Sequence, residues 1–305
     1  VVLNTGSPIT MNWLANVAAV IQAWYPGQEC GNAIADVLFG DANPSGKLPQ
    51  TFPVRLEDNP AYINYPGENG RVHYGEGLFV GYRYYEKKKV VPLFPFGFGL
   101  SYTTFKYDSL RLNVQEIGPD DTLEVQVDIT NVGQRAGKEI VQLYVRDIAA
   151  SLHRPEKELK AFTKVYLEPG QRKTITFSLR RDALAYYDDL ARAWVAEAGE
   201  FEVLVGASSQ DIRAIAPFTL TTSSRFGGHS EKKRIRFGMQ STIGELLAND
   251  AARAVIDSYM PGVTDMQEVT MVMNWTLEQV AGMVPDMLPE ALLQRIVNDL
   301  ERLDI

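Results

Sequence analysis

Residues 123–205 contain four short stretches in which apolar and polar side chains alternate, and this alternation constrains the fold more than any other feature of the chain. Successive side chains of a strand point to opposite faces of a sheet, so a period of two predicts strands with one buried face. The stretches cover residues 123–129, 141–145, 175–179 and 201–205, and turn-forming residues separate them. Short alternating strands at this spacing predict an all-β sandwich.

The first hundred residues show a different pattern, which predicts an α/β unit. The apolar residues 18–24 indicate a buried strand, and the following Pro26-Gly27 pair breaks the chain. Apolar side chains three and four apart in residues 29–39 predict a helix that stops at Gly40. A strand, an elbow and a helix form half of a βαβ unit, so we expect part of an α/β fold with an incomplete, mostly parallel sheet.

The other segments of this portion are expected to be short. Residues 1–3 indicate a further buried strand, residues 13–17 share one helical face, and residues 79–85 are rich in β-prone aromatic side chains. Residues 92–99 alternate Phe, Pro and Gly and should form a stiff connector. We therefore expect a domain boundary at about residues 100–107.

After the sandwich, the hydrophobic period returns to that of a helix. Residues 223–233 form an expected linker, and an apolar stripe over residues 243–255 stops before Pro261. Thr242 with Glu245 and Thr276 with Gln279 each fit a capping box. The last helix follows Pro289 and has its apolar face at Leu292, Leu293, Ile296, Val297 and Leu300. We expect this helical tail to dock on the main body of the protein or on a second subunit.

Composition and charge narrow the class of protein. The chain has 305 residues, a formal net charge of −8 and an isoelectric point near 5.1, which argues against nucleic acid or a membrane surface as its main partner. A single cysteine, Cys30, excludes an internal disulfide and suits a reducing compartment. No apolar run reaches the length of about 18 residues that a membrane span needs. Because the chain opens at Val1 inside an expected strand, we expect a fragment, with the cytoplasm favoured and secretion as the alternative.

Several long motifs resemble the second domain of family 3 glycoside hydrolases. They are residues 24–29 (WYPGQE), 31–40 (GNAIADVLFG), 43–49 (NPSGKLP), 74–85 (YGEGLFVGYRYY) and 92–102 (PLFPFGFGLSY). Residues 154–162 (RPEKELKAF) are similar to a recurrent segment of the fibronectin type III-like domain that many members of this family contain. The resemblance covers about three quarters of the chain. Cys30 departs from it, since the family usually has Gly at that position.

The resemblance implies a division into three parts and an activity. Residues 1–100 would be the C-terminal part of the family's α/β sandwich domain, residues 101–222 a fibronectin III/Ig-like sandwich, and residues 223–305 a linker and helical tail. The complete protein would be a retaining β-glucosidase that hydrolyses terminal β-D-glucosyl residues without metal or cofactor. In this family the nucleophilic Asp lies on a preceding barrel domain and the acid/base Glu lies before the position that Val1 matches. The chain would then contain no catalytic residue and would be inactive alone.

The resemblance implies two partners, a β-glucoside or oligosaccharide substrate and the missing barrel domain. The barrel could be in the same polypeptide or in a second chain. The resemblance leaves open whether the protein forms a homo-oligomer. Two alternatives remain. The enzyme could be a β-xylosidase of the same family, because the pocket that distinguishes glucose from xylose would lie mainly on the barrel. If the chain is complete, it could instead be a non-catalytic carbohydrate-binding or interaction module.

The residues that could bind substrate lie in two Gly-containing loops, the first with Tyr25, Gln28 and Glu29 and the second with Tyr74 and Glu76. Ligands of parallel α/β sheets gather beyond the carboxyl ends of the strands, where the first loop lies. Glycoside hydrolysis needs a pair of carboxyl groups, and tyrosine rings suit the apolar face of a pyranose. The alternative, which the resemblance favours for both glutamates, is a structural role in which the carboxylates pair with backbone amides or Arg and the tyrosines pack between domains.

Overall fold

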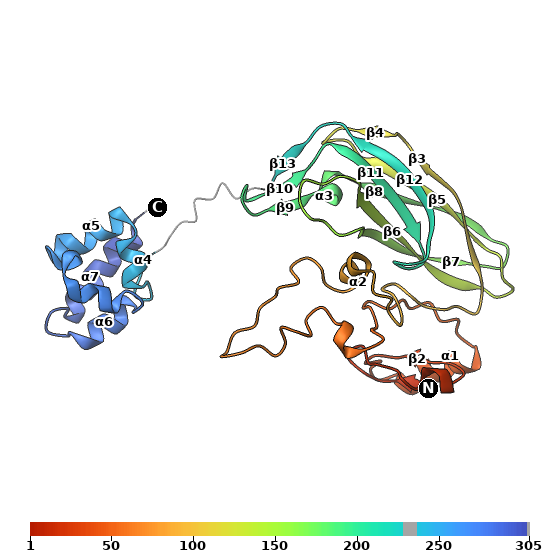
Figure 1. Ribbon diagram of the computed structural model, residues 1–305, viewed down its shortest axis with the longest axis horizontal. Coiled ribbons are helices and arrows are strands. Elements are labelled where there is room, and N and C mark those ends of the chain that lie inside the picture. The colour runs from red at the N-terminus through yellow and green to blue at the C-terminus, as the bar shows by residue number, and fades with distance from the viewer. Residues whose placement is uncertain (228–236, 304–305) are drawn as a thin grey trace. The chain divides into compact units, whose positions relative to one another are not determined.

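The structure, a computed structural model, describes residues 1–227 and 237–303. It contains two compact units, Val1–Gly228 and His229–Ile305, and each has a hydrophobic core of its own (Figure 1). None of the helices in these described residues is long and apolar enough to cross a membrane. The linker expected at residues 223–233 is partly a strand, because β13 covers Ser224–Phe226, and residues 228–233 lie outside the described ranges.

The first portion begins with two short parallel strands. Strand β1, Val2–Leu3, pairs with β2, Ile21–Gln22, and Val2 lies opposite Ile21. This confirms the strand expected at the start of the chain, but the expected burial is wrong, because Val2 is 38% exposed. The strand expected at residues 18–24 is shorter and only half-buried, because β1 is its one partner in the described structure. The helical face expected at residues 13–17 is a single 3-10 turn, Leu14–Asn16.

The first helix, α1, covers Cys30–Phe39 and confirms the helix expected after the elbow. It ends at Gly40, whose φ of +85° is the left-handed conformation that glycine adopts without strain. In the described structure none of the ten residues of α1 is buried, and Phe39 is 83% exposed. Two apolar side chains at the end of the helix, Leu38 and Phe39, are therefore left exposed in the described structure.

Residues 79–85 were expected to be β-prone, but the structure forms a helix there, α2, over Tyr82–Lys88. Gly81 precedes the helix with a φ of +54° and Lys89 ends it with a φ of +55°. β-propensity reflects how a side chain fits a pleated, half-buried surface, and packing can override it. Here the aromatic and charged side chains recur three and four residues apart and fit one face of a helix that packs on the sandwich. Residues 56–74, between α1 and α2, are irregular apart from the 3-10 turn Leu56–Asp58, as expected.

The sandwich consists of two main sheets, and all four alternating stretches are strands, as predicted (Figure 1). The three-stranded sheet has the order β3 (Phe105–Leu112), β5 (Leu123–Asn131), β8 (Arg172–Leu179). The five-stranded sheet has the order β4 (Glu116–Ile117), β12 (Ile212–Leu220), β11 (Gly199–Gly206), β6 (Gly137–Asp147), β7 (Glu158–Leu167). Only the β4–β12 pairing within these two sheets is parallel.

A smaller sheet completes the first unit. It has the order β13, β10 (Ala193–Ala196), β9 (Tyr186–Asp188), and the short helix α3 (Arg181–Leu184) precedes it. The inward side chains of the two main sheets form the core, in which Leu123, Leu143 and Val203 are fully buried. The alternation in the sequence therefore marks the buried face of each strand.

The second unit is a set of short helices, as expected for the tail. The helices are α4 (Ile243–Leu247), α5 (Asp250–Tyr259), α6 (Leu277–Met283) and α7 (Glu290–Glu301), with 3-10 turns at Val263–Asp265 and Gln267–Val272. Both capping boxes are confirmed, and Thr242 and Thr276 also form a β-bridge with each other. The apolar stripe at residues 243–255 spans two helices, because Asn249 accepts hydrogen bonds from the first amides of α5 and starts a new helix.

Candidate functional site

The first loop with predicted substrate-binding residues joins β2 to α1. Tyr25, Gln28 and Glu29 are all exposed there, and Tyr25 is 81% exposed. Trp24 turns the chain into this loop with a φ of +56°, which is unusual for so bulky a residue. Glu29 lies at the N-cap of α1, and its Oε2 accepts a hydrogen bond of 2.7 Å from Asn32 Nδ2. Its negative charge is favourable at the start of a helix. This position is compatible both with a structural role and with contact to a substrate.

The second loop leads into α2. Tyr74 is 81% exposed, whereas Glu76 is half-buried. Oε2 of Glu76 is shielded from solvent and has no hydrogen-bond partner among the described residues. The described loop therefore lacks a donor for this oxygen. Leaving a buried acceptor unpaired costs about 1–3 kcal/mol of stability.

The described structure contains no hydrogen bond or ion pair that joins the two loops. It also contains no group of His, Cys, Asp or Glu side chains that could hold a metal ion. A depression lined by Asn274, Trp275 and Gln279 belongs to the second unit and includes none of the five predicted residues. The second loop is bordered by exposed apolar side chains, namely Tyr62, Ile63, Tyr65, Val72, Leu78 and Val80.

One side of the second loop is fixed to the sandwich by a face of α2 that the sequence interpretation missed. The side chains of this face form two pairs four residues apart, the spacing of neighbours on a helix. They are Tyr82, Arg83, Glu86 and Lys87, and Phe79, which precedes the helix, contacts the same part of the sandwich. Each of these side chains contacts a residue in 153–159, and all of these partners except His153 belong to the segment 154–162 that resembles the fibronectin-like domain. The helical spacing was visible in the sequence, but the aromatic residues favoured a strand.

Two ion pairs lie at the centre of this contact. Lys157 Nζ is 2.5 Å from Glu86 Oε1, with both side chains about nine-tenths buried, and Arg83 Nη2 is 3.1 Å from Glu158 Oε1. Burial raises the pKa of Glu86, and the hydrogen bond from Lys157 offsets this only in part. Burial also opposes ionisation of Glu158, but the surrounding cations, chiefly Lys160, hold its pKa below the usual value.

Aromatic contacts flank these pairs. The ring of Phe79 lies 5.2 Å from that of His153, and the hydroxyl of Tyr82 accepts a hydrogen bond of 2.9 Å from the backbone N–H of Leu159. Tyr82 also stacks on Phe96, with ring centroids 4.9 Å apart. Because this stacking engages the connector expected at residues 92–99, α2 is held on two sides.

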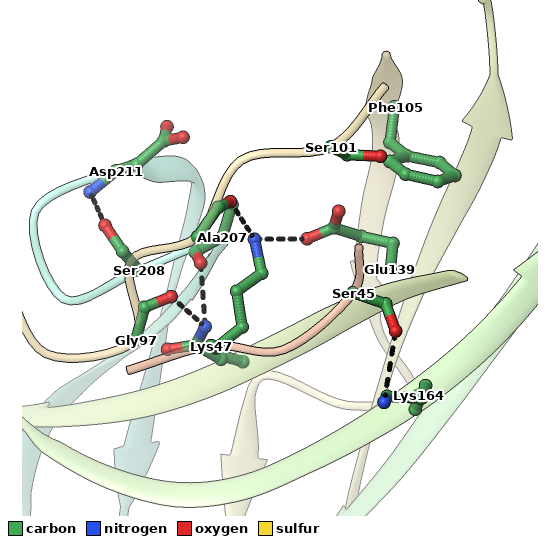
Figure 2. A network of polar contacts seen from close by, with 12 residues as sticks. Ser45, Lys47, Gly97, Ser101, Phe105, Glu139, Lys164, Ala207, Ser208 and Asp211 are labelled. Carbon is green, nitrogen blue, oxygen red and sulfur yellow. Dashed lines mark hydrogen bonds and ion pairs between the residues drawn. The ribbon is translucent and has the colours of Figure 1, made fainter. Parts of the chain in front are cut away.

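A second junction joins the first portion to the sandwich (Figure 2). Lys47 Nζ lies 3.2 Å from Glu139 Oε1 and donates a hydrogen bond of 3.0 Å to the carbonyl oxygen of Gly99. Gln142 Nε2 donates to the carbonyl oxygens of Gly97 (3.1 Å) and Ala207 (2.7 Å). Gly97 has a φ of +79°, and a Cβ there would collide with the Gln142 amide, so the approach requires glycine.

Residues 1–102 match the model of the glycosyl hydrolase family 3 C-terminal domain, and residues 139–209 match that of a fibronectin type III-like domain. Thermostable beta-glucosidase B of Acetivibrio thermocellus is 44% identical over 314 residues, which cover 100% of this chain and 41% of that protein. A beta-glucosidase of Rhizobium radiobacter is 53% identical over 218 residues, or 70% of this chain and 26% of that protein.

Solved structures agree with these matches. A beta-glucosidase from Kluyveromyces marxianus has a TM-score of 0.71 at 47% identity, covering 74% of this chain and 27% of that one. A GH3 beta-glucosidase of Bifidobacterium adolescentis has a TM-score of 0.70 at 41% identity, covering 84% of this chain and 36% of that one. The chain thus spans less than half the length of each of these relatives. It belongs to glycoside hydrolase family 3, of which it contains the C-terminal α/β domain portion and the fibronectin type III-like domain.

Proposed function

We propose that this chain is the C-terminal part of a retaining β-glucosidase and that it covers the active site of a barrel domain outside this chain. The observation that carries the proposal is the unpartnered apolar surface of the first unit. In the described residues α1 has no buried side chain, and the loop before α2 exposes a series of apolar side chains, of which Ile63 is 92% exposed. Exposed apolar surface on this scale marks an interaction site. The relatives named above, called beta-glucosidases, match this chain over only part of their own length.

The proposal extends to the architecture. The parallel pair β1–β2 would belong to a larger and mostly parallel sheet whose other strands lie outside this chain. The domain division would follow residues 1–100, 101–222 and 223–305. The partner surface for α1 and the second loop would come from the barrel domain, in the same polypeptide or in a second chain.

In this proposal Tyr25, Gln28, Glu29, Tyr74 and Glu76 contact substrate, and the two catalytic carboxyl groups lie outside the chain. A retaining mechanism places those carboxyl groups about 5 Å apart on either side of the glycosidic bond. The exposed ring of Tyr74 could stack on a sugar, and the half-buried carboxylate of Glu76 could accept a hydrogen bond from a sugar hydroxyl. Both loops would also exclude water from the leaving-group side of the site.

The test compares the complete enzyme with residues 1–305 alone on an aryl β-glucoside. We expect turnover by the complete enzyme and none by the isolated chain, because the chain would lack both catalytic acids. An aryl β-xyloside in the same assay separates β-glucosidase from β-xylosidase activity. Turnover by the purified isolated chain would contradict the assignment, and oligosaccharide binding without activity in the complete protein would favour a non-catalytic module.

A further inference from the structure

We infer that residues 156–158 of the sandwich hold the Tyr74 and Glu76 loop in place through α2, and that Lys157 and Glu158 are positioning residues for the leaving-group side of the reaction. The inference rests on the proposed function, because it explains what holds the loop that would contact substrate under that function. Neither residue touches substrate in this proposal. Each acts through a partner on α2.

The first step of the argument is the short connection between the loop and α2. The backbone N–H of Gly77 donates to the carbonyl oxygen of Tyr74 at 3.2 Å, and that of Phe79 donates to Glu76 at 2.9 Å. Two successive turns thus link both candidate side chains to Phe79, and Gly81 then begins the helix. Because so few residues intervene, a displacement of α2 would be passed on to Glu76.

The second step is the contact between α2 and the sandwich. Phe79, which precedes α2, and four residues of one face of α2 all contact residues 153–159. The Glu86–Lys157 pair is buried, and Oε2 of Glu86 has no partner among the described residues. If Lys157 were lost, Glu86 would remain as a buried carboxylate without a cation, so this helix position depends on the pair.

The third step is the rigidity of the anchor itself. Glu158 begins β7 and is also bound by Arg154, whose Nη2 lies 2.9 Å from Glu158 Oε2. Arg154 in turn contacts Asp147 at 3.0 Å and donates to the carbonyl oxygen of Leu184 at 2.8 Å. The carboxylate that receives Arg83 is therefore held by the sandwich independently of α2. A group fixed in this way can position another one.

The rival explanation is that these pairs only attach one domain to the other. Lys47 provides a matched control, because it also forms a buried pair across the same pair of domains, with Glu139 at 3.2 Å. The exposed fractions of the two lysine side chains are 12% for Lys47 and 10% for Lys157. Lys47, however, contacts Gly99 and the sandwich, whereas Lys157 contacts the helix that follows the candidate loop.

The experiment measures kcat/KM of the complete enzyme for an aryl β-glucoside with a bulky aglycone and for β-glucosyl fluoride, together with Tm. Fluoride is too small to contact a leaving-group wall. For Lys157→Met we expect kcat/KM for the bulky glucoside to fall about tenfold more than for the fluoride, since misplacement of a positioning group by about 1 Å is costly. Lys47→Met should lower Tm and change both substrates by the same factor. The double variant Glu86→Leu/Lys157→Met, which removes the stranded charge, should recover part of the selectivity.

Equal factors for the two substrates in Lys157→Met and Lys47→Met would overturn the inference. If Lys157→Met fails to fold, Phe79→Ala removes the ring contact with His153 without stranding a charge and should show the same preference for the small leaving group. Unchanged selectivity in Phe79→Ala would then overturn the inference. If the wild-type enzyme hydrolyses neither substrate, the proposed function itself fails and the inference with it.

Discussion

Lys47 Nζ and Glu139 Oε1 lie 3.2 Å apart and join the first portion of the chain to the sandwich (Figure 2). The hydroxyl of Tyr107 donates to the same carboxylate oxygen at 3.1 Å, and the exposed fraction of the Glu139 side chain is only 6%. Burial and the neighbouring Glu139 both raise the pKa of Tyr107, which keeps its phenol protonated as a donor. The junction is thus a buried polar network with satisfied partners, and removing one partner leaves the others desolvated.

We therefore expect Lys47→Met to lower the free energy of unfolding of the first unit by about 3 kcal/mol. Lys106→Met is the control, because Lys106 pairs with Asp108 at 3.0 Å on the surface, where its side chain is 62% exposed. An exposed pair contributes less than about 1 kcal/mol. Urea unfolding followed by tryptophan fluorescence measures both variants. Similar midpoints for the two variants would contradict a buried junction.

Asp128 makes a contribution to the stability of the sandwich that is lost at acid pH. Its carboxylate accepts a hydrogen bond of 2.6 Å from Thr174 Oγ1 and is also bound by Arg172 and Arg111. These interactions, that of Thr174 first, lower the pKa of Asp128 in the folded state. A lowered pKa stabilises the fold above the unfolded-state value of about 3.9, and this contribution is lost as the pH falls towards the folded-state value.

Asp128→Asn should therefore lower the stability of the sandwich at neutral pH and reduce its loss below about pH 4. Urea midpoints measured from neutral to acid pH check this for the variant and the wild type. Asp120→Asn is the control, because the Asp120 side chain is 87% exposed although it also pairs with an arginine, Arg181. Curves for Asp128→Asn and wild type that run parallel through the acid range would refute the role of this carboxylate.

Glu76→Gln tests the candidate substrate contact in the complete enzyme. Replacement of the charged acceptor by a neutral amide weakens the hydrogen bond and should raise KM for an aryl β-glucoside roughly tenfold, with a smaller change in Tm. Glu68→Gln, an exposed carboxylate of the same loop, should leave KM unchanged. If the two variants have the same KM, Glu76 has a structural role and the unpaired oxygen finds its donor elsewhere in the protein.

The second unit should fold alone, since it has its own core around Leu246, Ile296 and Leu300. In residues 229–305 produced separately, Thr276→Ala removes the capping box of α6 and should cost about 1 kcal/mol. Ser258→Ala, at an exposed hydroxyl that bonds only the preceding turn, should cost much less. Thermal unfolding followed by circular dichroism at 222 nm compares the two. An unfolded wild-type fragment would show that this core needs the rest of the protein.

Local patterns predicted the elements whose conformation is decided locally. The alternation that marks β5 and β6 and the capping box at Thr242 involve neighbours in the sequence, so the chain displays them directly. Helix α2 was missed because its conformation depends on packing against the sandwich. The Glu86–Lys157 pair was missed for the same reason, as 71 positions separate its members. The two candidate loops were located by their motifs, but their mutual placement depends on contacts that the sequence pattern does not encode.

The solvent-facing position of α1 has a practical consequence for producing this chain. Leu38 and Phe39 would be covered in a complete enzyme, but in the isolated chain they are exposed apolar side chains, and the sheet β1–β2 has no third strand among the described residues. Recombinant samples of the 305 residues should tend to aggregate. A multimer seen in gel filtration would then reflect non-native association through these exposed side chains. The quaternary structure therefore has to be measured on the complete enzyme, in which α1 would be covered.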